Sequence, residues 1–200
     1  MFDVQQIVRL HRDTVELWHG QEISNPYTGV LELVCEQHKF NFLLWHEEDI
    51  ARSPNVGDAR IAAVKRAIDG YNQKRNDGIE KIDDYLVLQQ AASRVQLHSG
   101  AKLNTETPGS ATDRLSILAL RIYHMQEQAA RADASPEHRA GAEAKLTILL
   151  EQHADLSRSL AELIDDIAAG RKQLKVYRQF KMYNDPALNP YLYGLKKMAG

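Results

Sequence analysis

The sequence predicts an all-α protein, an elongated up-and-down helical bundle with one very long central helix. Apolar residues recur at three- and four-residue steps in five segments, the spacing that places side chains on one face of a helix. Proline and glycine residues separate these segments, and no stretch alternates apolar and polar residues as a half-buried strand does. The chain of 200 residues, 44% of them apolar, is long enough for one domain spanning residues 1–200 with its own core.

The two N-terminal helices are expected over residues 3–18 and 28–53. Asn25-Pro26 breaks the chain between them, and Pro54 ends the second helix. The inward stripe of the first helix includes one histidine among apolar residues: Val4, Ile7, His11, Val15 and Trp18. The stripe of the second helix changes from apolar to charged towards its C-terminal end: Leu31, Cys35, His38, Phe42, Trp45, Asp49 and Arg52.

The third helix is expected to begin near Asp58 and to end where Gly100 can adopt a left-handed conformation. A helix of that length spans on the order of 60 Å. Its apolar stripe is Ile61, Ile68, Ile79, Ile82 and Leu86. Residues 101–109 are expected to form a loop.

Two further helices complete the predicted bundle, which spans residues 1–170. Ser110 is the expected N-cap of the fourth helix, and Ser135-Pro136 signals the start of the fifth. The fifth helix has a heptad-like seam and stops at Gly170; the seam is Leu146, Leu149, His153, Leu156, Leu160, Leu163 and Ile167. Residues 171–200 are expected to form an ordered, non-helical, Tyr-rich arm that packs on the bundle.

The charge is distributed unevenly. From residue 171 onward there are seven basic residues and one acidic residue, so this arm carries 7 − 1 = +6, and the remainder carries −2 − 6 = −8. Either the basic arm docks on an acidic body, or a phosphate-bearing ligand lies between the two. No nucleic-acid motif, signal peptide or membrane span is recognised, and the single Cys35 cannot form an internal disulfide, so we expect a cytoplasmic protein.

A polar row runs beside the apolar stripe of the third helix and provides the main candidates for a functional site. Its residues are Lys65, Asp69, Asn72, Asn76, Glu80 and Asp83, with Arg75 next to them. Asn and Asp are poor helix formers because they compete for backbone hydrogen bonds. Such a row therefore indicates either hydrogen bonds across the bundle or the wall of a binding site.

Two other groups could carry chemistry. On the second helix, His46, Glu48, Asp49 and Arg52 lie beside Trp45, where desolvation favours a general base or a metal ligand. On the third, Glu80-x-x-Asp83 places two carboxylates one turn apart, a geometry able to hold Mg²⁺ or Mn²⁺. No Cys/His spacing supports a structural zinc site. The histidines on apolar stripes, His11, His38, His124 and His153, are interpreted as core residues rather than ligands.

Four strings carry a resemblance to a known family: LWHEEDIAR, KRAIDGYNQKRNDGIEKID, TETPGSATDRLSIL with IYHM, and KMYNDPALNP. They resemble the uncharacterised bacterial family called domain of unknown function 4254, from about His38 to Tyr193. The resemblance implies a single helical cytoplasmic domain without an assigned activity. It adds polar motif positions to the candidate ligand-binding residues: Arg66, Asp113, Arg114, Lys181 and Asn184.

Two classes of function remain open. The first is a site for a phosphorylated metabolite, nucleotide or sugar phosphate, with hydrolysis or transfer at phosphate assisted by Mg²⁺ or Mn²⁺. In this hypothesis the catalytic residues are His46, Glu48, Asp49, Asp69, Asn72, Asn76, Glu80 and Asp83, with Glu80 and Asp83 as metal ligands. The ligand-binding residues are Arg52, Lys65, Arg66, Arg75, Asp113, Arg114, Lys181 and Asn184, of which Arg52, Lys65, Arg75 and Arg114 hold the phosphate. The second class is a non-catalytic helical scaffold with a buried polar network. A homodimer through the fifth helix is a further possibility.

Overall fold

The structure is a computed structural model and describes residues 2–178, 185–192 and 194. Five long helices make up most of it: α1 (Val4–Gly20), α2 (Val30–Arg52), α3 (Asp58–Ser93), α4 (Pro108–Ala130) and α5 (Pro136–Ala168). Two short strands, β1 (Lys102–Leu103) and β2 (Lys172–Gln173), pair in parallel. The predicted all-α fold is confirmed, including the very long α3, which has 36 residues.

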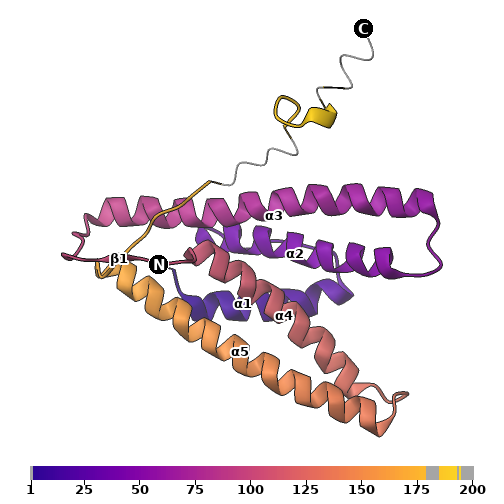
Figure 1. Ribbon diagram of the computed structural model, residues 1–200. Helices are drawn as coiled ribbons and strands as arrows, with labels where there is room; N and C mark the ends of the chain where they lie inside the picture. The colour runs from indigo at the N-terminus through magenta and orange to yellow at the C-terminus, as the bar shows by residue number, and fades with distance from the viewer. Residues whose placement is uncertain (1, 179–184, 193, 195–200) are drawn as a thin grey trace.

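The helices form two antiparallel hairpins, α2 with α3 and α4 with α5, and α1 lies between them (Figure 1). The helices run up and down within each hairpin, but the two hairpins diverge towards the α2–α3 and α4–α5 turns. The C-terminal end of α1 lies in the angle that this divergence creates. This arrangement brings α1, α2 and α4 together at one end of the molecule.

One hydrophobic core unites all five helices. The predicted inward stripe of α1 is confirmed, since Ile7, Val15 and Trp18 are buried in this core. Leu115 and Leu120 of α4 and Leu160 of α5 pack into it from the other hairpin. A smaller cluster of Leu44, Val64 and Ile68 joins the outer halves of α2 and α3. Burial of these apolar side chains is the main favourable term in folding.

Two predicted helix boundaries are wrong. α3 ends at Ser93 instead of Gly100, and Arg94 adopts the left-handed conformation. The helix ends here because residues 95–103 run alongside the segment after α5. The His98 amide donates a hydrogen bond to the Gly170 carbonyl at 2.9 Å. α4 begins at Pro108, because Thr107 is the N-cap and accepts a hydrogen bond from the amide of Ser110. The predicted start and end of α5, at Ser135 and before Gly170, are confirmed.

The first part of the C-terminal arm, up to Arg178, contacts the bundle. Arg178 pairs with Glu80 at 3.1 Å and also with Asp84, both on α3. Residues 190–192 lie in a short helical turn. The predicted ligand-binding residues Lys181 and Asn184 lie outside the described residues. Within the described part of the chain, none of the helices combines the length and apolar character needed to cross a membrane.

Candidate functional site

Asp113 is the centre of a buried polar network that joins α2, α3 and α4. Its Oδ1 accepts hydrogen bonds from Gln37 Nε2 at 2.6 Å, Asn41 Nδ2 at 2.9 Å and Arg75 Nε at 2.7 Å. A second guanidinium nitrogen of Arg75 donates to Oδ2 at 2.5 Å, which completes a bidentate ion pair. Asp113 is 4% exposed. The two predicted ligand-binding residues Arg75 and Asp113 therefore bind each other.

The network continues towards α1. Asn41 Nδ2 also donates to Ser116 Oγ at 2.8 Å, and that oxygen lies 2.6 Å from His38 Nδ1. The His38 ring lies 4.6 Å from the His11 ring, and both side chains are completely buried. The prediction that His11 and His38 are core residues is confirmed. Burial lowers the pKa of His38 to about 3 and that of His11 well below its ordinary value, because desolvation disfavours the charged imidazolium.

A close backbone approach fixes α4 against α3 beside this network. Asp83 is buried, and its Oδ1 accepts a hydrogen bond from the Gly109 amide at 2.7 Å. A Cβ at Gly109 would lie 2.6 Å from the Ile79 carbonyl oxygen, so only glycine fits here. Desolvation raises the pKa of Asp83, partly offset by hydrogen bonds from Thr107 and Gly109. The two predicted metal ligands therefore have different partners: Asp83 accepts a hydrogen bond from an amide in the first turn of α4, and Glu80 pairs with Arg178.

The remaining predicted residues are scattered along α2, α3 and α4. On α3, Lys65 pairs with Asp69 on the exposed surface, Arg66 is exposed, and Asn72 and Asn76 are partly buried. Arg52 pairs with Glu48 at 3.0 Å and with Asp49 at 3.6 Å. Arg114 is exposed and pairs with Glu106 at 2.6 Å. No described ligand pocket gathers these side chains; the catalytic and binding roles assigned to them stay predictions.

Three histidines from three helices converge where α1 ends in the angle between the hairpins. They are His19 of α1, His46 of α2 and His124 of α4, and one ring nitrogen of each lies within 4.8 Å of the other two. The Nε2 atoms of all three are buried and have no hydrogen-bond partner among the described residues. A buried polar atom without a partner is costly, so three that converge call for a ligand.

Hydrogen bonds set the tautomers of two of these rings. His19 Nδ1 lies 2.6 Å from the Val15 carbonyl oxygen, and His124 Nδ1 lies 2.8 Å from Glu127 Oε2. Since the Val15 carbonyl and the ionised Glu127 carboxylate can only accept, each Nδ1 carries a proton, and in the neutral imidazole Nε2 is then the nitrogen with the lone pair. Metal-ligating histidines usually donate their other ring N–H to a backbone carbonyl or a carboxylate in this way.

Aromatic side chains hold the three rings in place. His124 stacks on Trp45 with ring centroids 4.7 Å apart and an interplanar angle of 8°, and His19 stacks on Tyr123 at 4.1 Å. The His46 ring meets Phe42 edge-on at 4.5 Å. The pKa of His46 is lowered, first by burial and then by the neighbouring His19 and His124. Neutral imidazoles are the form that binds metal.

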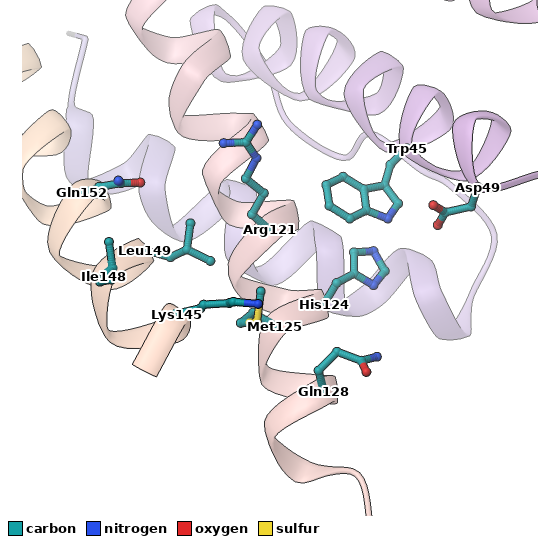
Figure 2. Close-up of a pocket in the computed structure, with 10 residues that line it drawn as sticks. All are labelled: Trp45, Asp49, Arg121, His124, Met125, Gln128, Lys145, Ile148, Leu149 and Gln152. Atoms are coloured by element: carbon teal, nitrogen blue, oxygen red, sulfur yellow. The ribbon is translucent and has the colours of Figure 1, made fainter. Parts of the chain in front are cut away.

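A groove opens beside the three histidines, between the end of α2 and the α4–α5 hairpin (Figure 2). It has a volume of about 570 Å³, within the range of small-molecule sites. Ten residues line it: Trp45, Asp49, Arg121, His124, Met125, Gln128, Lys145, Ile148, Leu149 and Gln152. His124 belongs to both the histidine cluster and the groove wall, so the two features adjoin.

The sequence analysis identified His46 as a functional residue, interpreted His124 as a core histidine and missed His19. Because these three histidines lie on three separate helices, no short Cys/His spacing that would indicate a zinc site is present in the sequence. One signal was present: each of the three histidines directly follows an aromatic residue, in Trp18-His19, Trp45-His46 and Tyr123-His124. In the structure two of these aromatic residues contact a histidine of another helix: Tyr123 stacks on His19, and Trp45 stacks on His124.

Comparison with known proteins gives a family and no activity. None of the curated proteins and none of the solved structures matches the chain significantly. The family model described as "Protein of unknown function (DUF4254)" matches residues 31–176. This range includes His46, His124 and the whole groove, and His19 lies before it. Because the match covers most of the chain, the protein belongs to the DUF4254 family.

Proposed function

We propose that the protein binds a divalent transition metal, foremost Zn²⁺, at His19, His46 and His124 and uses it for hydrolysis of a small molecule in the adjoining groove. The observation that supports this is the approach of one ring nitrogen from each of three histidines to within 4.8 Å of the other two, together with three buried Nε2 atoms that have no partner among the described residues. Zn–N distances of about 2.0–2.1 Å place tetrahedral nitrogen ligands roughly 3.4 Å apart. Small rotations of the imidazoles cover the difference from the separations of up to 4.8 Å.

The number of ligands favours a catalytic over a structural metal. Structural zinc sites have four protein ligands, whereas catalytic sites have three and an open fourth position. Among the described residues the group of potential ligands contains these three histidines alone. A metal bound there supplies Lewis-acid chemistry to a water in the fourth position.

The residues around the histidines have distinct tasks in this proposal. The Val15 carbonyl and Glu127 orient His19 and His124 through their Nδ1 protons. Asp49, on the groove wall and more than half exposed, acts as the general base that accepts a proton from water. This retains the catalytic assignments of His46 and Asp49 and places them at one site.

The proposal changes the metal expected from the sequence and keeps the substrate class. Imidazole nitrogens favour Zn²⁺ and other borderline transition metals, whereas Mg²⁺ and Mn²⁺ favour oxygen ligands. Hydrolysis at phosphate remains the reaction to test first, since zinc centres polarise phosphoryl oxygens.

Metal binding tests the proposal directly. We expect purified protein to bind one Zn²⁺ per chain in equilibrium dialysis followed by elemental analysis, and Zn²⁺ at about 100 times its Kd to add about 2.7 kcal/mol to the free energy of unfolding. His19→Ala, His46→Ala and His124→Ala should each lose this binding, and His98→Ala, outside the cluster, should keep it. Equal Zn²⁺ binding by all four variants would overturn the assignment.

A non-catalytic scaffold is the second candidate, and the Asp113 network favours it. This network joins α2, α3 and α4 through four hydrogen bonds to Asp113, and each of these links is internal to the protein. Buried polar groups of this kind can fix the register of packed helices. A protein that folds as described and binds no metal would support this function.

Cytoplasmic location in a bacterium and self-association are part of the proposal. The Cys35 thiol is buried, and desolvation raises its pKa to about 12, so it is a packing group and not a reactive thiol. The seam residues Leu160, Leu163 and Ile167 are buried within one chain, and Leu146 and Leu149 are partly buried. Ile148 and Leu150, which lie beside the seam, are exposed and form the exposed half of this part of α5. A homodimer would use this exposed half, and sedimentation analysis would detect it.

A further inference from the structure

The chemistry of the groove indicates the kind of molecule that reaches the histidine cluster. Figure 2 shows Trp45 and His124 on one side of the groove and Ile148, Leu149 and Lys145 on the other, with Arg121 and Met125 between them. The apolar side chains on both sides offer a surface for a hydrophobic or aromatic body. Gln128 and Gln152 add uncharged hydrogen-bonding groups at the edge.

The two cations of the groove lack ion-pair partners in the described part of the chain. Neither Arg121 nor Lys145 forms a salt bridge with a described residue. In contrast, Arg114 of α4 pairs with Glu106, Arg158 of α5 pairs with Asp155, and Arg131, which follows α4, pairs with Asp133. The single acid of the groove, Asp49, is within 3.6 Å of Arg52. The lining therefore carries two positive charges and one negative charge, a net +1.

Arg121 connects this groove with a second hollow along the α4–α5 hairpin. Arg121 and Gln152 line both, and the second hollow, of about 680 Å³, continues to Arg114 and Glu106. Within the first groove, Arg121 lies on α4 one turn before His124, so its guanidinium and the histidine cluster share one helix face. Arg121, Lys145 and His124 line the same groove, so an anion bound in the groove and the histidine cluster share one hollow.

We propose that the substrate is an organic phosphate monoester with an apolar or aromatic body, whose phosphate is held by Arg121 and Lys145 and whose body lies against Trp45, Met125, Ile148 and Leu149. This inference rests on the proposed function. The planar guanidinium matches the oxygens of a phosphate in a bidentate manner, and the apolar walls exclude a compact, fully hydrated ligand.

The reaction balances with the groups present. Asp49 accepts one proton from water as the water oxygen forms a bond to phosphorus. The ester P–O bond breaks, and the leaving oxygen takes that proton to give the alcohol, with inorganic phosphate as the other product. Arg121 and Lys145 neutralise the charge on the non-bridging oxygens in this step.

Binding of phenylphosphonate, which cannot be hydrolysed, tests the inference. Isothermal titration calorimetry is performed on the Zn²⁺-treated full-length protein, with benzoate and methylphosphonate as comparison ligands. We expect Arg121→Gln and Lys145→Gln each to weaken phenylphosphonate binding about tenfold or more, as loss of a charged hydrogen bond does. Arg9→Gln, an exposed arginine on α1, is the matched control and should leave the affinity unchanged. Methylphosphonate, without the aromatic body, should bind more weakly than phenylphosphonate to every variant.

The outcomes separate this inference from the proposed function, because Zn²⁺ stoichiometry is measured on the same samples. One Zn²⁺ per chain with phenylphosphonate affinity insensitive to Arg121→Gln and Lys145→Gln would overturn the substrate assignment and leave the metal centre standing. Affinity sensitive to both substitutions without Zn²⁺ binding would support the anion groove and overturn the metal centre. Tighter binding of benzoate than of phenylphosphonate would overturn the choice of phosphate in favour of a carboxylate.

Discussion

The Asp113 network and the three-histidine cluster are both polar groups inside a helical protein, and they differ in how their atoms are partnered. Asp113 accepts four hydrogen bonds from Gln37, Asn41 and Arg75. The three imidazoles, in contrast, each bring one ring nitrogen within 4.8 Å of the other two, and their buried Nε2 atoms have no hydrogen-bond partner among the described residues. The Asp113 carboxylate is fully partnered, and the atoms of its network that lack a partner among the described residues, Gln37 Oε1 and His38 Nε2, belong to separate side chains at its edges. The histidine cluster differs because it gathers one ring nitrogen from each of three helices at one point, as a metal site does.

The Asp113 network and the histidine cluster also differ in their electrostatics. Asp113 gains a charged partner, so removal of one member leaves a buried charge uncompensated. In the histidine cluster, burial and then the neighbouring His19 and His124 lower the pKa of His46, an effect that Asp49 and Glu127 partly oppose. We therefore expect substitutions in the network to affect stability and substitutions in the cluster to affect metal binding.

The largest expected effect is on the network itself. Asp113→Asn should lower the free energy of unfolding by about 3–5 kcal/mol, because Arg75 loses its counter-charge in a largely buried position. Asp133→Asn is the matched control: it breaks the Arg131–Asp133 pair, whose side chains are 44% and 74% exposed, and it should have a much smaller effect because solvent screens an exposed pair. Urea unfolding measures both, and similar losses would remove the distinction between structural and surface pairs.

The next effect is on pH dependence. In the folded protein the pKa of His38 is about 3, below its ordinary value of 6.5, so the unfolded chain binds a proton first as pH falls. The stabilisation is complete above pH 6.5 and is lost as the pH falls from 6.5 towards 3. Between pH 7 and pH 5 the free energy of unfolding should fall by about 2 kcal/mol for His38, and His11 should act in the same direction.

Urea unfolding at pH 7, 6 and 5 measures this dependence. His38→Gln, which cannot titrate in this range, should reduce the slope. A free energy of unfolding that stays constant over this range would contradict the assignment of His38 as a neutral, buried histidine.

A smaller effect concerns the close approach that seats α4 beside the network. Gly109→Ala should destabilise the protein by about 1–3 kcal/mol, because the new methyl group would lie 2.6 Å from the Ile79 carbonyl oxygen and 2.8 Å from Asp83 Cγ. Gly141→Ala, in α5 with no atom within 4 Å of the added Cβ, should stabilise the protein by up to about 1 kcal/mol. Thermal unfolding of the pair checks the opposite signs.

The smallest effect on stability is expected in the histidine cluster. His46→Leu should change the free energy of unfolding of the metal-free protein by less than about 1 kcal/mol, since it leaves no partner of Nε2 unsatisfied, and it should abolish stabilisation by Zn²⁺. Unfolding with EDTA and with Zn²⁺ separates the two effects. A large loss in EDTA would place His46 among the structural residues, together with Asp113.

Much of the fold followed from local patterns. The apolar stripes placed five helices, and Ser135-Pro136 fixed the start of α5, because caps and periodic stripes depend on neighbours in the chain. The end of α3 did not follow, since it depends on pairing of residues 95–103 with the segment after α5. His19 escaped notice for a related reason: its partners are 27 and 105 residues away in the chain.

The sequence by itself determined the helical class, most helix boundaries and the polar character of α3, because periodicity and capping are local properties. It also contained the polar residues of both regions compared above. Only the tertiary structure decided which of them meet: Arg75 with Asp113, Asp83 with Gly109, and His46 with His19 and His124. Hydrogen-bond satisfaction and metal coordination depend on distances between helices, and the packing of the two hairpins around α1 sets those distances.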